Sequence, residues 1–141
     1  MLREIKARVR FISAEPLLEN LVGLNLQGIA WVIGGGESGS HLMKEKLLTT
    51  RGLVRHGDRK HGEALWMPRE DRIDWARSLR DQCAAAGTAF WWKQFGGPRP
   101  ESGGRELDGR VHNGMPTFVH GAMPEAYEHR KGTQFSLPVI Q

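Results

Sequence analysis

The sequence is poor in cysteine and in long apolar runs. Its 141 residues include one cysteine, Cys83, which excludes an internal disulfide and a cysteine-rich metal site. No apolar run approaches the ~20 residues that cross a bilayer. Residues 1–6 also lack the long apolar segment of a secretory signal. These absences predict a cytoplasmic protein with no membrane segment.

The charge is only moderately unbalanced, with a net charge of +4. Much of the positive excess lies in residues 51–72 and 129–131, outside the expected strands. A solvated basic loop explains this distribution, and a nucleic-acid surface is the alternative. His56 and His61 do not have the spacing of known metal ligands, so we expect no metal site.

Three segments have the pattern of strands. They are residues 8–13, which alternate before Pro16, the apolar run 29–36, and the aromatic-rich run 88–95. The length fits one domain and is short of the ~250 residues of a complete eight-stranded parallel barrel.

A helix is predicted between the second and third strands, over residues 70–86. Its apolar side chains recur at three- and four-residue steps, and Gly87 suits its carboxyl end. A strand, a helix and a strand in this order predict a right-handed parallel crossover. We therefore expect an α/β fold with three parallel strands and one crossover helix.

The connections differ in length. Residues 14–28 leave room for one or two helical turns, which we place at 17–22. Residues 38–67 form a connection far longer than the usual ~2–6 residues. We interpret it as a mobile lid containing a short helix, the alternative being an insertion without function. The turn dipeptides of the polar stretch 99–110 predict a small hairpin.

Glycines and a carboxylate follow the second strand directly. Ligands bind at the carboxyl ends of parallel strands, and glycine lets a ligand approach the backbone. The run 34–39 therefore indicates a site around Glu37, the alternative being a glycine-rich turn with a solvated glutamate. The run matches neither the dinucleotide fingerprint nor the Gly-x-Ser-x-Gly frame of hydrolases.

One charged residue lies at the carboxyl end of each predicted strand. These three are our candidate catalytic residues: Glu15, Glu37 and Lys93. Converging carboxylates and an amine can bind a polar ligand or shift one pKa for acid–base work. A structural Glu–Lys pair is the alternative. The candidate cofactor- or substrate-binding residues are Gly34, Gly35, Gly36, Ser38, Trp92 and Gln94. Lys93 and Gln94 can face one site only if the strand ends in a bulge.

Four segments in one order resemble a known family: residues 10–18, 31–39, 80–87 and 90–97. They are similar to the C-terminal half of a phage and bacterial family of unknown function, named after phage gene products thirty-seven and sixty-eight. Residues 103–110 resemble its closing segment, and the similarity covers residues 7–116. Full-length members resemble radical S-adenosylmethionine enzymes, whose N-terminal half carries a three-cysteine motif for a [4Fe–4S] cluster in a (β/α) barrel.

The resemblance implies that the three strands are the last strands of such a barrel, with Glu15, Glu37 and Lys93 at its mouth. It divides the chain into a partial barrel at 1–97 with the insertion 38–67, a family-like segment at 98–116 and an irregular tail at 117–141. The three-cysteine motif is absent, so we expect no cofactor on this chain alone. S-adenosylmethionine and the [4Fe–4S] cluster are implied for the full-length family.

We therefore expect a truncated or split product of a phage or bacterial gene, whose partner is the missing N-terminal half. Such a fragment is inactive alone, its reaction is unknown, and the sequence does not decide whether it belongs to an enzyme. The alternative is a small α/β module that binds nucleic acid or a phosphorylated ligand.

Overall fold

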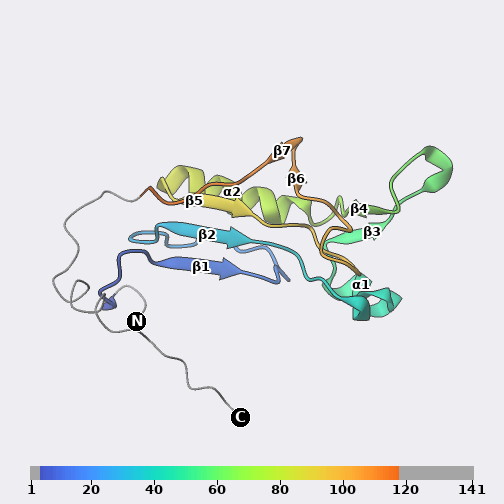
Figure 1. The fold of residues 1–141 in the computed structure, drawn as a ribbon, viewed down its shortest axis with the longest axis horizontal. Coiled ribbons are helices and arrows are strands. Elements are labelled where there is room, and N and C mark those ends of the chain that lie inside the picture. The colour runs from blue at the N-terminus through green and yellow to red at the C-terminus, as the bar shows by residue number, and fades with distance from the viewer. Residues whose placement is uncertain (1–3, 118–141) are drawn as a thin grey trace, which may run out of the picture.

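The computed structural model describes residues 4–117, so the tail predicted at 117–141 lies outside the described residues except for Thr117. Three strands form one parallel sheet: β1 (Phe11–Ala14), β2 (Trp31–Gly34) and β5 (Ala89–Trp92). Their order in the sheet is their order in the chain, with β2 in the middle (Figure 1). The predicted α/β fold with three parallel strands is confirmed.

The strands are shorter than predicted, but their pairing continues beyond their ends. The Gly36 amide donates to the Gln94 carbonyl at 2.9 Å, and the Gly39 amide donates to the Gly97 carbonyl at 2.9 Å. The segments that follow β2 and β5 therefore run side by side past the sheet.

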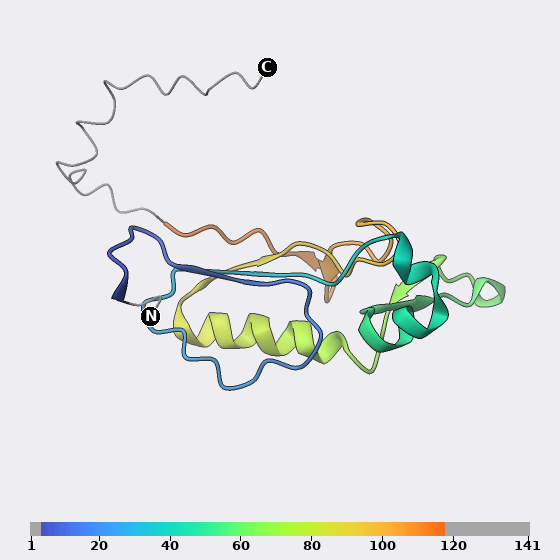
Figure 2. The ribbon, with the colours of Figure 1, turned by 90° about the horizontal axis from the view of Figure 1, so that it is seen from below.

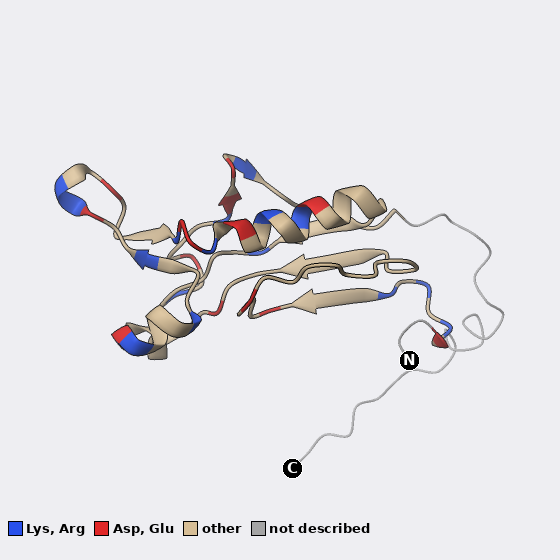
Figure 3. Ribbon diagram, turned by 180° about the vertical axis from the view of Figure 1, so that it is seen from behind, with Lys and Arg blue, Asp and Glu red and all other residues tan. Residues whose placement is uncertain are grey.

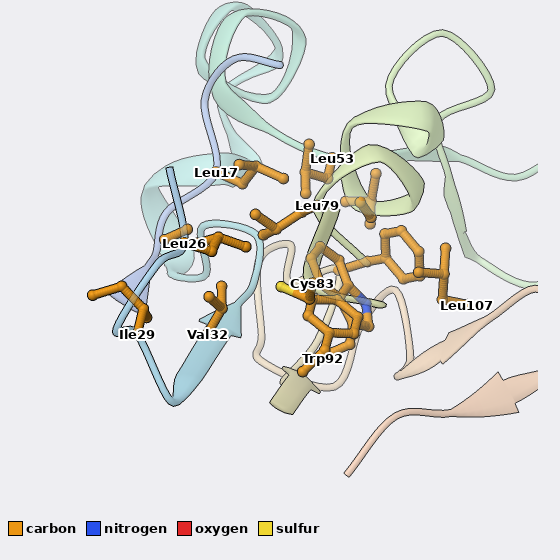
Figure 4. Close-up of a cluster of buried hydrophobic side chains, with 14 of the residues drawn as sticks. Leu17, Leu26, Ile29, Val32, Leu53, Leu79, Cys83, Trp92 and Leu107 are labelled. Carbon is orange, nitrogen blue, oxygen red and sulfur yellow. The ribbon is translucent and has the colours of Figure 1, made fainter. Parts of the chain in front are cut away.

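Helix α2 (Ile73–Ala86) covers one face of the sheet (Figure 2). The predicted stripe is its inner face, because Ala76, Leu79 and Cys83 are all fully buried. Gly87 ends the helix in the left-handed conformation, with φ 66°. The buried side chains of α2 form one hydrophobic core with residues of the sheet and of the connecting segments (Figure 4). These residues include Leu17, Leu26, Ile29, Val32, Leu53, Trp92 and Leu107.

The opposite face of the sheet carries a row of aromatic rings. Ring centroids of Phe11 and Trp31 lie 6.1 Å apart, and those of Trp31 and Trp91 lie 6.3 Å apart. Arg105 lies over the Trp91 ring at 5.4 Å. No helix within residues 4–117 covers this face, and Phe11 is 50% exposed (Figure 2).

The linker between β1 and β2 contains no helix, so the turns predicted at 17–22 are wrong. Part of its backbone bonds to a side chain of α2. The Gln82 amide nitrogen donates to the Leu21 carbonyl at 2.6 Å, and the Leu24 amide donates to the Gln82 side-chain oxygen at 2.8 Å. Leu17 and Leu26 enter the core at an irregular spacing, which an extended chain permits.

The long connection between β2 and α2 is folded and lies beyond the carboxyl ends of the strands (Figure 1). It contains η2 (Ser40–Met43), α1 (Glu45–Arg51), β3 (Val54–His56), η3 (Arg59–His61) and β4 (Trp66–Pro68). The short helix expected there is therefore present. Its apolar side chains belong to the core: Leu42, Leu48, Leu53 and Val54. Part of the segment therefore packs into the body of the protein, and the β3–β4 hairpin extends outward from it (Figure 1). Its interpretation as a mobile lid stays a prediction.

The predicted C-terminal hairpin is confirmed as β6 (Glu106–Leu107) and β7 (Arg110–Val111). Its turn residues Asp108 and Gly109 have φ of 54° and 70°, as a type I′ turn requires. The chain then returns antiparallel along β5. The Trp92 amide donates to the His112 carbonyl at 2.9 Å, and the Gly114 amide donates to the Phe90 carbonyl at 2.8 Å. The outer edge of β5 is therefore partly covered, and β1 is the opposite edge of the sheet.

Candidate ligand cleft

A cleft with a volume of about 350 Å³ lies at the carboxyl ends of the parallel strands. It is lined by Glu15, Pro16, Gly36, Glu37, Ser38, Arg51, Lys93 and Gln94. The three parallel strands carry no charged residue (Figure 3). Glu15, Glu37 and Lys93 follow these strands, and Arg51 comes from α1. All three predicted catalytic residues thus line one cleft of a size typical for small molecules.

Glu15 and Lys93 meet across the middle strand. The Lys93 Nζ lies 3.3 Å from Glu15 Oε1, although the two residues follow opposite outer strands. Gly35 lies between them, and a Cβ there would be 2.6 Å from Glu15 Oε1. Glycine at this position therefore leaves the space that the Glu15 side chain occupies.

Glu37 is held by two residues of the insertion. Arg51 Nε donates to Glu37 Oε2 at 2.6 Å, and His41 Nε2 lies 2.9 Å from Glu37 Oε1. Burial opposes ionisation, but the hydrogen bonds from Arg51 and His41 outweigh it and lower the pKa of Glu37. Glu37 is therefore an ionised anchor for Arg51, and this arrangement does not suit a general base.

Ser38 and Gln94 close the cleft between β2 and β5. Gln94 Nε2 donates to Ser38 Oγ at 3.0 Å, and Ser38 forms a parallel bridge with Gly97. Strand β5 ends at Trp92, and this ending allows Lys93 and Gln94 to line the same cleft. The bulge that the sequence argument required stays a prediction, because strict alternation applies only within the strand.

The three glycines pack against the protein itself. A Cβ at Gly34 would be 2.9 Å from Leu79 Cδ2, and a Cβ at Gly36 would overlap the Phe95 carbonyl. Gly36 lines the cleft and Gly34 does not, so ligand access to the backbone stays a prediction for Gly36. Both glycines also have a structural role. They allow the helix and the β5 continuation to approach β2.

Trp92 does not belong to the cleft. Its side chain is fully buried, and its ring lies 5.1 Å from that of Phe95 on the helix-covered face. Its predicted role as a ligand contact is corrected, because alternation along β5 sends Trp91, and not Trp92, to the open face.

Sequence reasoning missed Arg51 and His41 as residues of this site. They come from α1 and η2, and only the folding of the insertion brings them to Glu37. A weak signal was available, since the insertion is rich in basic residues and directly follows the carboxylate.

A second hollow of about 390 Å³ lies between α1 and the β3–β4 hairpin. Its charged side chains are paired with one another. Arg55 bonds Glu63 and Glu70, and Arg69 bonds Asp71. This region is best described as an ion-pair network that attaches the hairpin.

The donor set of this chain does not fit an iron–sulfur cluster. A cluster needs several thiolates, and Cys83 is fully buried on α2, where burial raises its pKa to about 11. Within residues 4–117 there is also no group of three or more histidine, cysteine, aspartate or glutamate residues that could hold a metal ion.

The fold and the cleft together define an α/β protein with a polar cleft at the carboxyl edge of a parallel sheet. The chain belongs to a family described as "Protein of unknown function (DUF5131)", whose profile matches residues 1–53 and 60–116. The unmatched residues between these ranges include β3. Comparison with curated proteins gives no match, and neither does comparison with solved structures. No helix within the described part of the chain is long and apolar enough to cross a membrane.

Proposed function

We propose that the sheet is part of a (β/α) barrel resembling those of radical S-adenosylmethionine enzymes, and that the cleft is its substrate site. The observation that carries this proposal is the continuity of the open face. Steps of two residues lead along β1 from Phe11 to Glu15 and along β5 from Trp91 to Lys93. The strands thus carry aromatic side chains on this face, and charged side chains lie at their carboxyl ends.

This change from apolar to charged side chains along the strands supports the proposal that the open face is the interior of a barrel. In a (β/α) barrel the helices lie outside, side chains fill the inside, and ligands bind at the carboxyl ends of the strands. Helix α2 covers one face here (Figure 2), and the row of Phe11, Trp31 and Trp91 occupies the other. The chain order of the strands, β1-β2-β5, is the order that a barrel requires, with each strand next to its predecessor.

The covered edge of β5 indicates where further strands would add. Residues 112–114 already bond to β5, so a parallel strand would pair with β1. We propose that a partner with the N-terminal half of the barrel supplies these strands. Cluster chemistry, if the enzyme uses it, would then depend on cysteines of that half, and this chain alone would be inactive.

Within the proposed enzyme this chain binds and orients a polar substrate. Lys93 and Glu15 offer a donor and an acceptor at 3.3 Å from each other. Glu37 holds Arg51 at the wall of the cleft.

Sedimentation and thermal unfolding test the missing strands. The purified chain is expected to associate through the β1 edge and the aromatic face. Adding the N-terminal half of an intact family member should give a defined complex with a sharper unfolding transition. Phe11→Lys, on the edge strand, should prevent both effects. Val22→Lys is the matched control, because Val22 is 69% exposed on the linker. A monodisperse monomer with a sharp transition and no complex would contradict the proposal.

The aromatic row favours one alternative function, a platform for single-stranded nucleic acid. Phe11, Trp31 and Trp91 lie in a row, and Arg105 adds a cation at one end. Stacking of a base on such a ring contributes about 1–3 kcal/mol. Salt-dependent quenching of tryptophan fluorescence by an oligothymidylate would support the platform, provided that Trp91→Ala weakens binding and Trp66→Ala, in the outlying hairpin, does not.

A further inference from the structure

The cleft contains more uncommitted hydrogen-bond donors than acceptors. Arg51 uses only its Nε, which donates to Glu37 at 2.6 Å. Its two terminal nitrogens have no hydrogen bond to any residue in the described range 4–117. Glu37 binds the Nε side of the guanidinium, so the two terminal nitrogens remain a planar pair of donors.

Lys93 and Ser38 add to this excess. The Lys93 ammonium has three N–H groups and, among the described residues, a single partner, Glu15, at 3.3 Å. The Ser38 hydroxyl accepts from Gln94, so its own proton is free to donate. The Lys93 side chain is 54% exposed and that of Arg51 is 42% exposed, so both remain accessible from the solvent.

The carboxylates of the cleft are already engaged. Glu37 bonds His41 and Arg51 through its two oxygens. Glu15 accepts from Ser13 through Oε2, and its Oε1 faces Lys93. The two acids therefore neutralise the cleft without exposing a free acceptor pair of comparable strength.

Seven other arginines within residues 4–117 have terminal nitrogens that are already bonded to protein oxygens: Arg10, Arg55, Arg69, Arg72, Arg77, Arg80 and Arg105. Arg55, Arg77 and Arg80 bond carboxylates, while Arg69 and Arg72 also bond backbone carbonyls of α1 and of Gly52 after it. Arg51 differs from them because its fork is open and faces a cavity.

We propose that the cleft binds the oxyanion of a small ligand, a carboxylate or a phosphate, between the terminal nitrogens of Arg51 and the ammonium of Lys93. The inference rests on the proposed function, since it names the substrate class of the same cleft. Paired N–H donors match two oxygens of a carboxylate or phosphate, and such charge-assisted bonds are about twice as strong as neutral ones. Glu37 is a positioning residue in this arrangement.

Titration of the ¹⁵N-labelled 141-residue chain, followed by NMR at constant ionic strength, tests the proposal. One arm uses inorganic phosphate and the other uses acetate. Each is expected to produce a saturable shift of the Arg51 Nε–H resonance, identified by its loss in Arg51→Gln. Tighter binding of phosphate would assign the site to phosphorylated ligands, and equal or tighter binding of acetate would assign it to carboxylates.

Variants separate a built site from general attraction by positive charge. Arg51→Gln and Lys93→Gln should each weaken binding by about tenfold or more. Arg59→Gln, which removes the same charge from the hairpin tip, should leave the affinity within about twofold. Arg51→Lys keeps the charge without the fork, so it should bind several-fold more weakly even where Arg51→Gln fails to fold.

A linear, unsaturable shift would overturn the proposal, as would equal losses in Arg51→Gln and Arg59→Gln. The outcome is independent of the missing strands, because sedimentation reports on the β1 edge and the titration reports on the cleft. Failure of either experiment leaves the other interpretable.

Discussion

Glu15 and Lys93 join the two outer strands of the sheet across the middle one. Glu15 follows β1, Lys93 follows β5, and their charged atoms approach to 3.3 Å above Gly35. The pair forms the floor of the cleft. Its position depends on the absence of a side chain at residue 35, so the glycine run and the charged residues form one structural unit.

The three glycines should respond differently to alanine. Gly36→Ala would force a Cβ into the Phe95 carbonyl, a backbone atom that cannot move alone. We expect it to destabilise the fold by about 1–3 kcal/mol or more, as overpacking does. Gly35→Ala meets only the end of the Glu15 side chain, so it should cost little stability and displace Glu15 from Lys93. Urea unfolding curves measure both.

Gly34→Ala is the intermediate case, because its Cβ would press on Leu79 and the Trp92 ring. Equal losses of stability in all three variants would contradict this account of the glycine run.

Glu37→Gln should loosen helix α1 while leaving the sheet intact. The substitution removes the charge that holds Arg51, in a pair whose arginine side chain is 42% exposed. A loss of about 1 kcal/mol is expected after allowance for solvent screening. Amide hydrogen exchange should speed up in α1 and not in α2. The pKa of Glu37 is lowered in the fold, so its stabilisation is present at neutral pH and declines as the pH falls below the ordinary value near 4.5.

Asp108 should make the docking of the β6–β7 hairpin acid-sensitive. Hydrogen bonds from Arg77, and then from Arg80, lower the pKa of Asp108 to about 2. A carboxyl whose folded pKa lies below its ordinary value of 3.8 stabilises the fold above 3.8, and this contribution is lost as the pH falls toward 2.

Asp108→Asn is the matched variant, because asparagine tolerates the left-handed turn. The urea midpoint of the wild type should therefore fall more than that of the variant between pH 5 and pH 2.5. If the urea midpoints of the two proteins fell by the same amount over this pH range, Asp108 would not link pH to stability.

Trypsin should cut the insertion first at its tip. Within residues 4–117, Arg59 and Lys60 lie exposed in η3, whereas Arg51 and Arg55 are ion-paired near the packed body of the insertion. Mass spectrometry of early fragments identifies the site, and replacement of Arg59 and Lys60 by glutamine should delay the first cut. An initial cut after Arg51 would instead support a mobile lid.

Cys83 should be unreactive in the folded chain. It is fully buried and burial raises the pKa of its thiol to about 11, so little thiolate forms at pH 8. Labelling by a thiol reagent should follow global unfolding and proceed at once in urea. Fast labelling of the native chain would show that α2 opens locally.

The secondary structure around α2 and the sheet could be predicted because local patterns determine it. An apolar run identified β2, and three- and four-residue spacing identified the buried face of α2. The turn at Asp108 was predictable for the same reason, since few residues tolerate two successive left-handed conformations.

The linker and the insertion were less predictable because their structure depends on distant residues. Leu21 and Leu24 bond Gln82, about sixty positions away in the chain, and no local pattern shows that bond. Likewise, Leu53 and Val54 belong to the core only through the folding of the insertion, which no local pattern shows.

For the cleft, the sequence by itself determined which residues end the strands, and thus that Glu15, Glu37 and Lys93 share one edge. Only the tertiary structure decided what each side chain does there. It paired Glu15 with Lys93, engaged Glu37 with Arg51 and His41, and buried Trp92 under α2. The physical reason is that strand ends are fixed by local chain direction, whereas hydrogen-bond partners depend on segments brought together by burial of the core.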